Sequence, residues 1–300
     1  MRNKFINTLE YLAEQDERIV FLTGDLGFSV VENFQQKFPQ RFYNVGIAEQ
    51  NMAGIAVGLA EAGMIPFIYS IAPFSLVRPF EFIKNGAILH NLPIRIVAIG
   101  AGFEYGDLGF THYLLEDIAL TRIYNNLTCY APVNNLVAEQ VLVNSYDHSG
   151  PVYYRISKNL NSLAEAQVSK YKQENIVSLQ NKKNAKVAVF AHAEILEEAL
   201  QVKETESNFD LFSIIKYNPL PREELLDILK KYDKVVTMEA HYKNNGLGSM
   251  IAEIIAEENL NIKFKRLGLE TTDFSLLGNK NFMYQNYGVG KADLISSIKI

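Results

Sequence analysis

The chain has 300 residues, 48% of them hydrophobic, which is the composition of a globular protein that can bury a full core. Its 29 Lys and Arg against 34 Asp and Glu give a net charge of −5, so we expect neither nucleic acid nor a membrane as a partner. No stretch approaches the roughly 20 apolar residues of a membrane span, and the N-terminus lacks a signal-peptide core, so a cytoplasmic location is expected. The one cysteine, Cys129, is interpreted as an inert thiol in a buried strand.

Helical periodicity alternates with short β-branched or aromatic runs along the first half of the chain. A helix is expected over residues 4–14, and strands are expected at 19–23, 42–45, 65–69, 94–99, 127–130 and 152–156. The segments between the strands suit right-handed crossovers, which predicts a mostly parallel sheet. Functional loops are then expected where the strands end, at 24–29, 46–50, 70–74 and 100–112.

A polar stretch separates this half from a second α/β unit. We place the first domain at 1–160, a linker at 161–184 and the second domain at 185–300. The second unit is expected to hold strands at 187–190, 211–215, 235–238 and 262–264, and helices at 193–203, 222–230 and 247–257. The predicted fold class is α/β, with two domains that each have a mostly parallel sheet flanked by helices.

Glu49 lies near the start of a helix that is rich in Ala and Gly. A carboxylate there is stabilised by the helix dipole and the free amides, so a first-turn cap is one interpretation. The small residues favour close packing against another element, such as a second subunit. Such packing would exclude water, raise the pKa of Glu49 and suit it to acid–base chemistry.

Ordered motifs extend over nearly the whole chain. They are GIAEQNMAGIAVGLAEAGMIPFIYS (46–70), APFSLVRPFE (72–81), NLPIRIVAIGAG (91–102), YGDLGFTHYLLEDIALTR (105–122), APVN (131–134), GPVYYRISKN (150–159) and VTMEAHYKNNGLGSMIAEI (236–254). Together they resemble the pyrimidine-binding and C-terminal domains of the transketolase superfamily of thiamine diphosphate enzymes.

The resemblance implies roles around the cofactor. Glu49 matches the glutamate that hydrogen-bonds the aminopyrimidine ring, and Asp25 matches an aspartate that faces the cofactor, although an Asx turn is its alternative. Phe74 and Phe80 fall where aromatic residues pack on the ring. His112 matches a histidine near the thiazolium and the substrate hydroxyls, with a core histidine as the alternative. Glu49 and His112 are therefore the expected catalytic residues.

Three further residues are expected to bind substrate together with His112. Ser29 matches a phosphate-contacting serine and Arg155 a phosphate-binding arginine, while Arg78 anchors its loop. The alternatives are a helix N-cap for Ser29 and a structural ion pair for Arg155.

The family's magnesium motif, Gly-Asp-Gly followed by Asn-Asn, does not occur in the chain, and no metal ligand is expected on it. The resemblance thus implies the smaller subunit of a split transketolase. An N-terminal partner subunit would hold Mg²⁺ and the diphosphate of thiamine diphosphate, in a heterotetramer built around a homodimer of this chain.

The implied reaction transfers a two-carbon ketol unit from a ketose to an aldehyde or sugar acceptor. Leu108 stands where phosphosugar transketolases carry a hydroxyl-binding aspartate, and Phe110 replaces a proline, so the usual aldose phosphate is not the expected acceptor. The alternatives are the β subunit of a 2-oxoacid dehydrogenase, a deoxyxylulose phosphate synthase-like enzyme, or a non-catalytic stabilising subunit.

Overall fold

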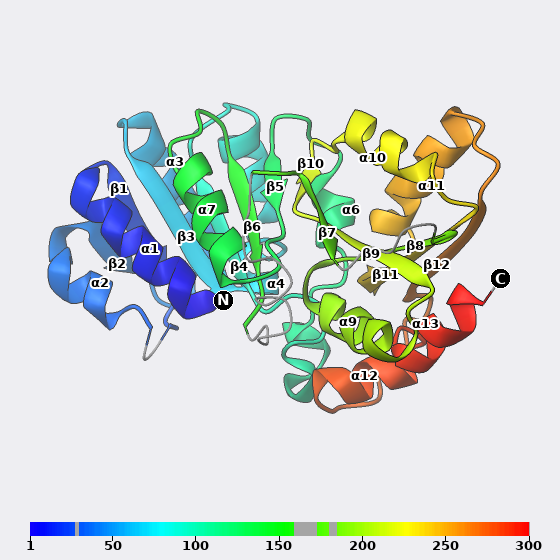
Figure 1. Cartoon of the computed structure of the whole chain (residues 1–300). Coiled ribbons are helices and arrows are strands. Elements are labelled where there is room, and N and C mark those ends of the chain that lie inside the picture. Colours follow the sequence, from blue (N-terminus) through cyan, green and yellow to red (C-terminus); the bar gives the residue numbers. More distant parts are fainter. Residues whose placement is uncertain (28–29, 159–172, 180–184, 300) are drawn as a thin grey trace.

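The computed structural model describes residues 1–27, 30–158, 173–179 and 185–299. The chain forms two sheets with helices packed on both, one that contains β1 to β6 and one that contains β7 to β9 with β11 and β12 (Figure 1). The predicted fold class is confirmed.

The first sheet has the strand order β10-β5-β6-β4-β3-β1-β2 and is parallel except for the β10–β5 pair. Strands β1, β4 and β6 are buried along their whole length, as expected for a parallel sheet covered on both faces. The elements of this half are α1 (Arg2–Gln15), β1 (Ile19–Thr23), α2 (Glu32–Lys37), η1 (Pro39–Arg41), β2 (Phe42–Asn44), α3 (Glu49–Glu61), β3 (Ile65–Ile71), α4 (Ala72–Ser75), α5 (Phe80–Phe82), η2 (Ile83–Ile88), β4 (Arg95–Ile99), η3 (Gly106–Leu108), η4 (Phe110–His112), α6 (Asp117–Thr121), β5 (Thr128–Tyr130), α7 (Asn135–Ser145) and β6 (Val152–Ile156).

The second sheet has the order β12-β11-β8-β9-β7, in which the β7–β9 pair is antiparallel. The elements of this half are β7 (Ile176–Leu179), β8 (Val187–Ala191), η5 (Ala193–Ile195), α9 (Leu196–Thr205), β9 (Phe209–Ile214), β10 (Lys216–Asn218), α10 (Arg222–Leu229), β11 (Lys234–Tyr242), α11 (Leu247–Glu257), β12 (Lys263–Leu269), α12 (Lys280–Asn286) and α13 (Lys291–Ile298).

Two strands depart from the predicted domain plan. β7 lies inside the expected linker, yet it pairs with β9 because its apolar residues are buried in the second sheet. β10 follows β9 in the chain, yet it pairs with β5 at the edge of the first sheet. The second half of the chain therefore completes the sheet of the first, and the two domains share a strand pairing.

The single cysteine behaves as its sequence context indicates. Cys129 is free and buried in β5, and burial raises the pKa of its thiol to about 12. A thiol of this kind is not ionised near neutral pH and is therefore a poor nucleophile.

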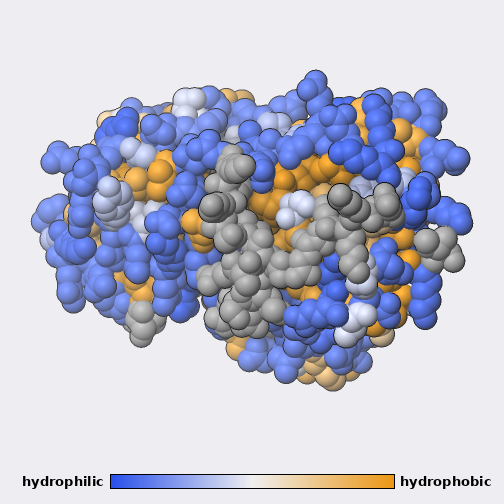
Figure 2. Space-filling view, viewed as in Figure 1, coloured by the Kyte–Doolittle hydropathy of each residue, from blue (hydrophilic) through white to orange (hydrophobic). Residues whose placement is uncertain are grey.

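The surface seen from this side is mostly hydrophilic, with hydrophobic residues in patches between the charged ones (Figure 2). No helix in the part of the chain that the structure describes has the length and apolar character needed to cross a membrane.

Candidate functional site

Glu49 lies where the ends of β1 and β2 meet the start of α3. It is the first residue of the helix, and only 2% of it is exposed. A Cβ on Gly24, just after β1, would lie 3.2 Å from the carbonyl oxygen of Gly46 and 3.7 Å from Oε1 of Glu49. Gly46 has a φ of 73°, a conformation that favours glycine. The two glycines therefore bring the carboxylate against the end of the sheet.

Arg78 holds this carboxylate with one nitrogen and stacks on an aromatic ring. Its Nη1 donates to Oε2 of Glu49 at 2.7 Å, and its Cζ lies 4.1 Å from the ring centroid of Phe74. The Phe74 ring in turn lies 5.2 Å from the His112 ring, edge to face. Residues expected from three separate motifs thus form one contiguous cluster, Glu49–Arg78–Phe74–His112.

Asp25 lies beside this cluster, one residue after Gly24. It is exposed and has a φ of 53°, which Asp tolerates better than most side chains. Oδ1 of Asn44 accepts hydrogen bonds from the backbone N–H of Asp25 at 2.9 Å and from that of Gly46 at 3.0 Å. Asn44, which the sequence analysis missed, therefore ties the loops after β1 and β2 together. Its position at the end of a strand, two residues before Gly46, is the signal that marks it.

His112 ends the short helix η4 and is half-buried. Its Nδ1 lies 3.0 Å from Oγ1 of Thr111, and its backbone N–H donates to the carbonyl of Gly109 at 2.9 Å. Leu108 and Phe110, in the same loop, are 52% and 57% exposed. This loop therefore presents one imidazole among exposed apolar side chains.

One other predicted site residue, Phe80, lies apart from this cluster. Phe80 begins α5 and packs against a core cluster, with its ring 6.1 Å from that of Tyr124, a contact separate from the Phe74 ring stack. Ser29 lies outside the residues that the structure describes.

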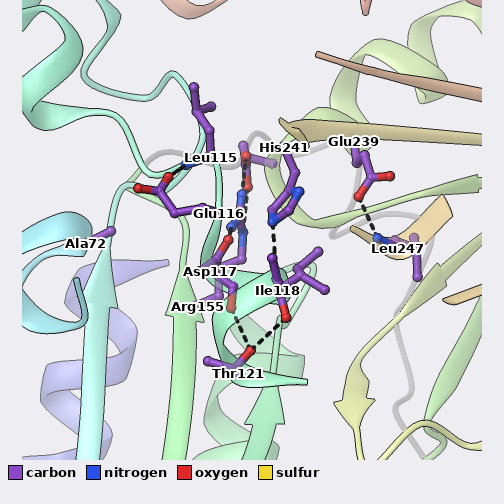
Figure 3. A network of polar contacts seen from close by, with 12 residues as sticks. Ala72, Leu115, Glu116, Asp117, Ile118, Thr121, Arg155, Glu239, His241 and Leu247 are labelled. Atoms are coloured by element: carbon purple, nitrogen blue, oxygen red, sulfur yellow. Dashed lines mark hydrogen bonds and ion pairs between the residues drawn. The ribbon is translucent and has the colours of Figure 1, made fainter. Parts of the chain in front are cut away.

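Arg155 is buried among carboxylates, which is the structural ion pair that its sequence context left open as the alternative to phosphate binding. Its Nη1 donates to both carboxylate oxygens of Asp117 (Figure 3). Its Nη2 donates to Oε1 of Glu194 at 2.8 Å. Burial alone would raise the pKa of Asp117, but the charge of Arg155 holds it below its usual value. Because Asp117 and Glu194 come from different domains, the two ion pairs of Arg155 link the domains.

Buried polar groups surround these ion pairs. Nε2 of His241 accepts from the backbone N–H of Ala119, and the Glu239 carboxylate accepts from the N–H groups of Leu247 and Gly248 at the start of α11 (Figure 3). Burial raises the pKa of Glu239 to about 8. The hydrogen bond between Ala119 and His241 joins α6 to β11 of the second domain.

Within the residues that the structure describes, no group of three or more His, Cys, Asp or Glu side chains is arranged to hold a metal ion. The site therefore consists of a buried carboxylate, a stacked aromatic ring and an imidazole, at the ends of parallel strands. This is the location at which open α/β sheets bind ligands.

The fold and this site define an α/β chain with a candidate ligand site built on a glutamate at a helix start. Matches to known protein domains identify the family of the chain. Residues 1–162 match "Transketolase, pyrimidine binding domain" and residues 177–293 match "Transketolase, C-terminal domain". The chain therefore belongs to the transketolase family, with these two domains in sequence.

Proteins of similar length resemble it along most of the chain. A Methanocaldococcus jannaschii chain that bears the name of a transketolase C-terminal section is 32% identical and is matched over 96% of this chain and 92% of its own length. One subunit of an apulose-4-phosphate transketolase from Actinobacillus succinogenes is 29% identical over 87% of this chain and 85% of its own. The solved structure "Split gene transketolase, inactive beta4 tetramer" is 28% identical, has a TM-score of 0.85 and covers 99% of this chain and 96% of its own.

Proposed function

We propose that this chain is the C-terminal subunit of a split, thiamine diphosphate-dependent transketolase that transfers a two-carbon ketol unit from a ketose to an aldehyde or sugar acceptor. The observation that carries the proposal is the Glu49–Arg78–Phe74–His112 cluster, because it joins a buried carboxylate to a stacking face and an imidazole. The names of the relatives, one a C-terminal section and one a subunit, support the division into two chains.

The cluster fits the aminopyrimidine ring of the cofactor. That ring is flat, and a nitrogen at its edge exchanges a proton with a neighbouring carboxyl group, so it needs a carboxyl group at its edge and an aromatic face against it. Glu49 supplies the carboxyl group and Phe74 the face, and the flat Arg78 guanidinium uses both at 2.7 and 4.1 Å. A planar group is therefore already accommodated between these two side chains.

When bound, thiamine diphosphate supplies the electron sink that makes carbon–carbon bond cleavage accessible. Glu49 would hold a proton against the pyrimidine nitrogen, and its burial keeps that proton from exchanging freely with water. Phe74 would orient the ring. The imidazole of His112 would donate a hydrogen bond to a substrate oxygen on which charge develops.

The proposed partner and assembly rest on the motifs and the exposed residues of this chain. Mg²⁺ and the cofactor's diphosphate are assigned to an N-terminal subunit, because the magnesium motif does not occur in this chain. Self-association is assigned to α3, where Gly54 and Gly58 leave open space and Ile55 is 37% exposed. Ile47, just before this helix, is 78% exposed. We therefore propose a heterotetramer built around a homodimer of this subunit.

The test compares two Glu→Gln substitutions on the same helix in the complex reconstituted with the N-terminal subunit. Glu49→Gln keeps the size of the side chain but removes the exchangeable carboxyl proton, so the ketol-transfer rate should fall at least ~100-fold. Glu61→Gln, at the exposed end of α3, should leave the rate unchanged. A near-normal rate for Glu49→Gln, with a lower melting temperature, would show that Glu49 is only a structural cap.

A further inference from the structure

The segment 270–279 of the second domain runs across the loop of the first domain that carries His112. The backbone N–H of Gly278 donates to the carbonyl of Gly106 at 3.5 Å. A Cβ on Gly106 would lie 2.4 Å from the carbonyl oxygen of Gly278, so the two backbones meet without room for a side chain. The second domain therefore packs directly on the start of the His112 loop.

Phe274, in the middle of this segment, lies between aromatic rings of both domains. On the first-domain side its ring stacks on that of Phe110 at 5.1 Å and meets that of Tyr113 edge to face at 6.0 Å. On the second-domain side its centroid lies 5.4 Å from the ring of Tyr287 and 6.2 Å from that of Tyr242. Phe110 and Tyr113 flank Thr111 and His112 in the sequence, so Phe274 contacts the residues on both sides of the imidazole.

The loop has little structure of its own to fix that imidazole. It consists of the two three-residue helices η3 and η4 and the turn at Gly109, whose φ is 87°. Helices this short are poorly stabilised by their own hydrogen bonds. Within the loop the Tyr113 hydroxyl donates to the Gly106 carbonyl at 2.8 Å, and the ring cluster around Phe274 adds support from outside it.

We infer that Phe274 is a positioning residue: the second domain uses it to fix the His112 loop, and through it the imidazole, without contacting the reacting atoms. The catalytic consequence rests on the proposed function, in which His112 bonds a substrate oxygen. The structural part, that Phe274 orders the loop, does not depend on it.

The first experiment measures amide hydrogen exchange of the full chain by mass spectrometry. Phe274→Ala should speed exchange in the peptide that spans 103–115 by at least about 10-fold, because aromatic contacts are lost on both sides of His112. The matched control is Phe264→Ala, which removes a half-buried ring of the same domain. That ring packs against a different hydrophobic cluster from Phe274, one that includes Val235 and Ile251. It should leave that peptide unchanged.

Phe274→Leu serves as the second variant, because it keeps an apolar side chain and so preserves folding if the alanine variant does not fold. Unchanged exchange in a folded Phe274 variant would overturn the inference. Equal acceleration by Phe264→Ala would overturn it as well, since the effect would then be a general loss of stability.

The second experiment measures kinetics in the reconstituted complex. Phe274→Ala should lower kcat/KM for ketol transfer about 10-fold, and Phe274→Tyr, which keeps the ring, should restore it. Normal kcat/KM in a variant whose loop exchanges faster would overturn the catalytic part of the inference. If the unmodified complex shows no ketol transfer while exchange still responds to Phe274, the proposed function fails and the positioning of the loop stands.

Discussion

Glu104 makes the stability of the chain depend on pH in a predictable direction. It lies in the loop after β4, where its carboxylate accepts a hydrogen bond from Oγ of Ser157 at 2.5 Å and from the backbone N–H of Lys158 at 2.8 Å. Burial, and then the nearby charge of Glu194, raise its pKa from 4.5 to about 7. The folded state therefore holds this proton more tightly than the unfolded state does.

The sign and size of the effect follow from that difference. A carboxyl whose pKa is raised by folding contributes stability below pH ~4.5, and this contribution is lost as the pH rises through about 7. One pKa unit corresponds to about 1.4 kcal/mol, so a shift of roughly 2.5 units removes up to about 3 kcal/mol, most of it between pH 5 and 8. The free energy of unfolding should therefore fall over this range.

Glu104→Gln isolates the contribution of this one group. The amide keeps the geometry, because its oxygen can accept from Lys158 and its nitrogen can donate to the Ser157 hydroxyl, but it carries no titrating proton. The free energy of unfolding should be measured in urea at pH 5 and at pH 8. Relative to the wild-type chain, that of the variant should rise by about 2–3 kcal/mol from pH 5 to pH 8. The control Glu61→Gln, at an exposed position, should follow the wild type. Parallel pH curves for the wild type and Glu104→Gln would refute the reasoning.

Two further predictions concern the domain interface and the cofactor. Asp117→Asn leaves Arg155 buried with only one of its two carboxylate partners. The free energy of unfolding, measured in urea, should therefore fall by about 3–5 kcal/mol. A loss under about 1 kcal/mol would mean that the Arg155–Asp117 ion pair is dispensable. The lone chain should bind thiamine diphosphate weakly in calorimetry, with tight binding only after the N-terminal subunit is added. Tight Mg²⁺-dependent binding by the lone chain would contradict the split site.

The sequence predicted the elements whose pattern is local. β1, β6 and α11 have the expected bounds because continuous apolar runs and a helical apolar face mark them directly. β10 was missed because a three-residue strand has no period of its own, and its pairing with β5 depends on residues about 90 positions away. The extension of β11 to Tyr242 was missed because the added residues include polar ones, Glu239 and His241, that are buried only in the folded chain.

In the candidate site, too, the sequence identified the residues that lie in local motifs but not the contacts made by distant parts of the chain. Glu49, Phe74 and His112 stand in motifs that the family resemblance marks, and the fold brings them together. Arg155 stands in such a motif too, but its partner Glu194 comes from the other domain, 39 residues further along the chain. A motif identifies a residue type at a strand end, whereas the charges that face it are set by the tertiary structure.

Arg78 provides the last prediction, because its contacts in the structure differ from the substrate-binding role expected from the sequence. The sequence motif led to the expectation that it binds substrate and anchors its loop, whereas in the structure its guanidinium binds Oε2 of Glu49 and covers the Phe74 ring. A pyrimidine ring cannot use this oxygen and this face while the guanidinium does. Arg78 would therefore leave the carboxylate when the cofactor binds, and the cofactor would compensate for the lost contacts.

Removing the guanidinium should then strengthen cofactor binding. A partly exposed stacked ion pair of this kind contributes about 1–2 kcal/mol, so Arg78→Ala should lower the Kd of thiamine diphosphate about 5- to 30-fold in the reconstituted complex. Arg122→Ala, which removes another Arg–Glu ion pair far along the chain, should leave the Kd unchanged. If Arg78→Ala instead leaves the Kd unchanged and raises KM for the sugar, the guanidinium binds substrate and is not displaced by the pyrimidine. The direction of the change in Kd therefore decides between the two roles, because only a group that competes with the cofactor can improve its binding by being absent.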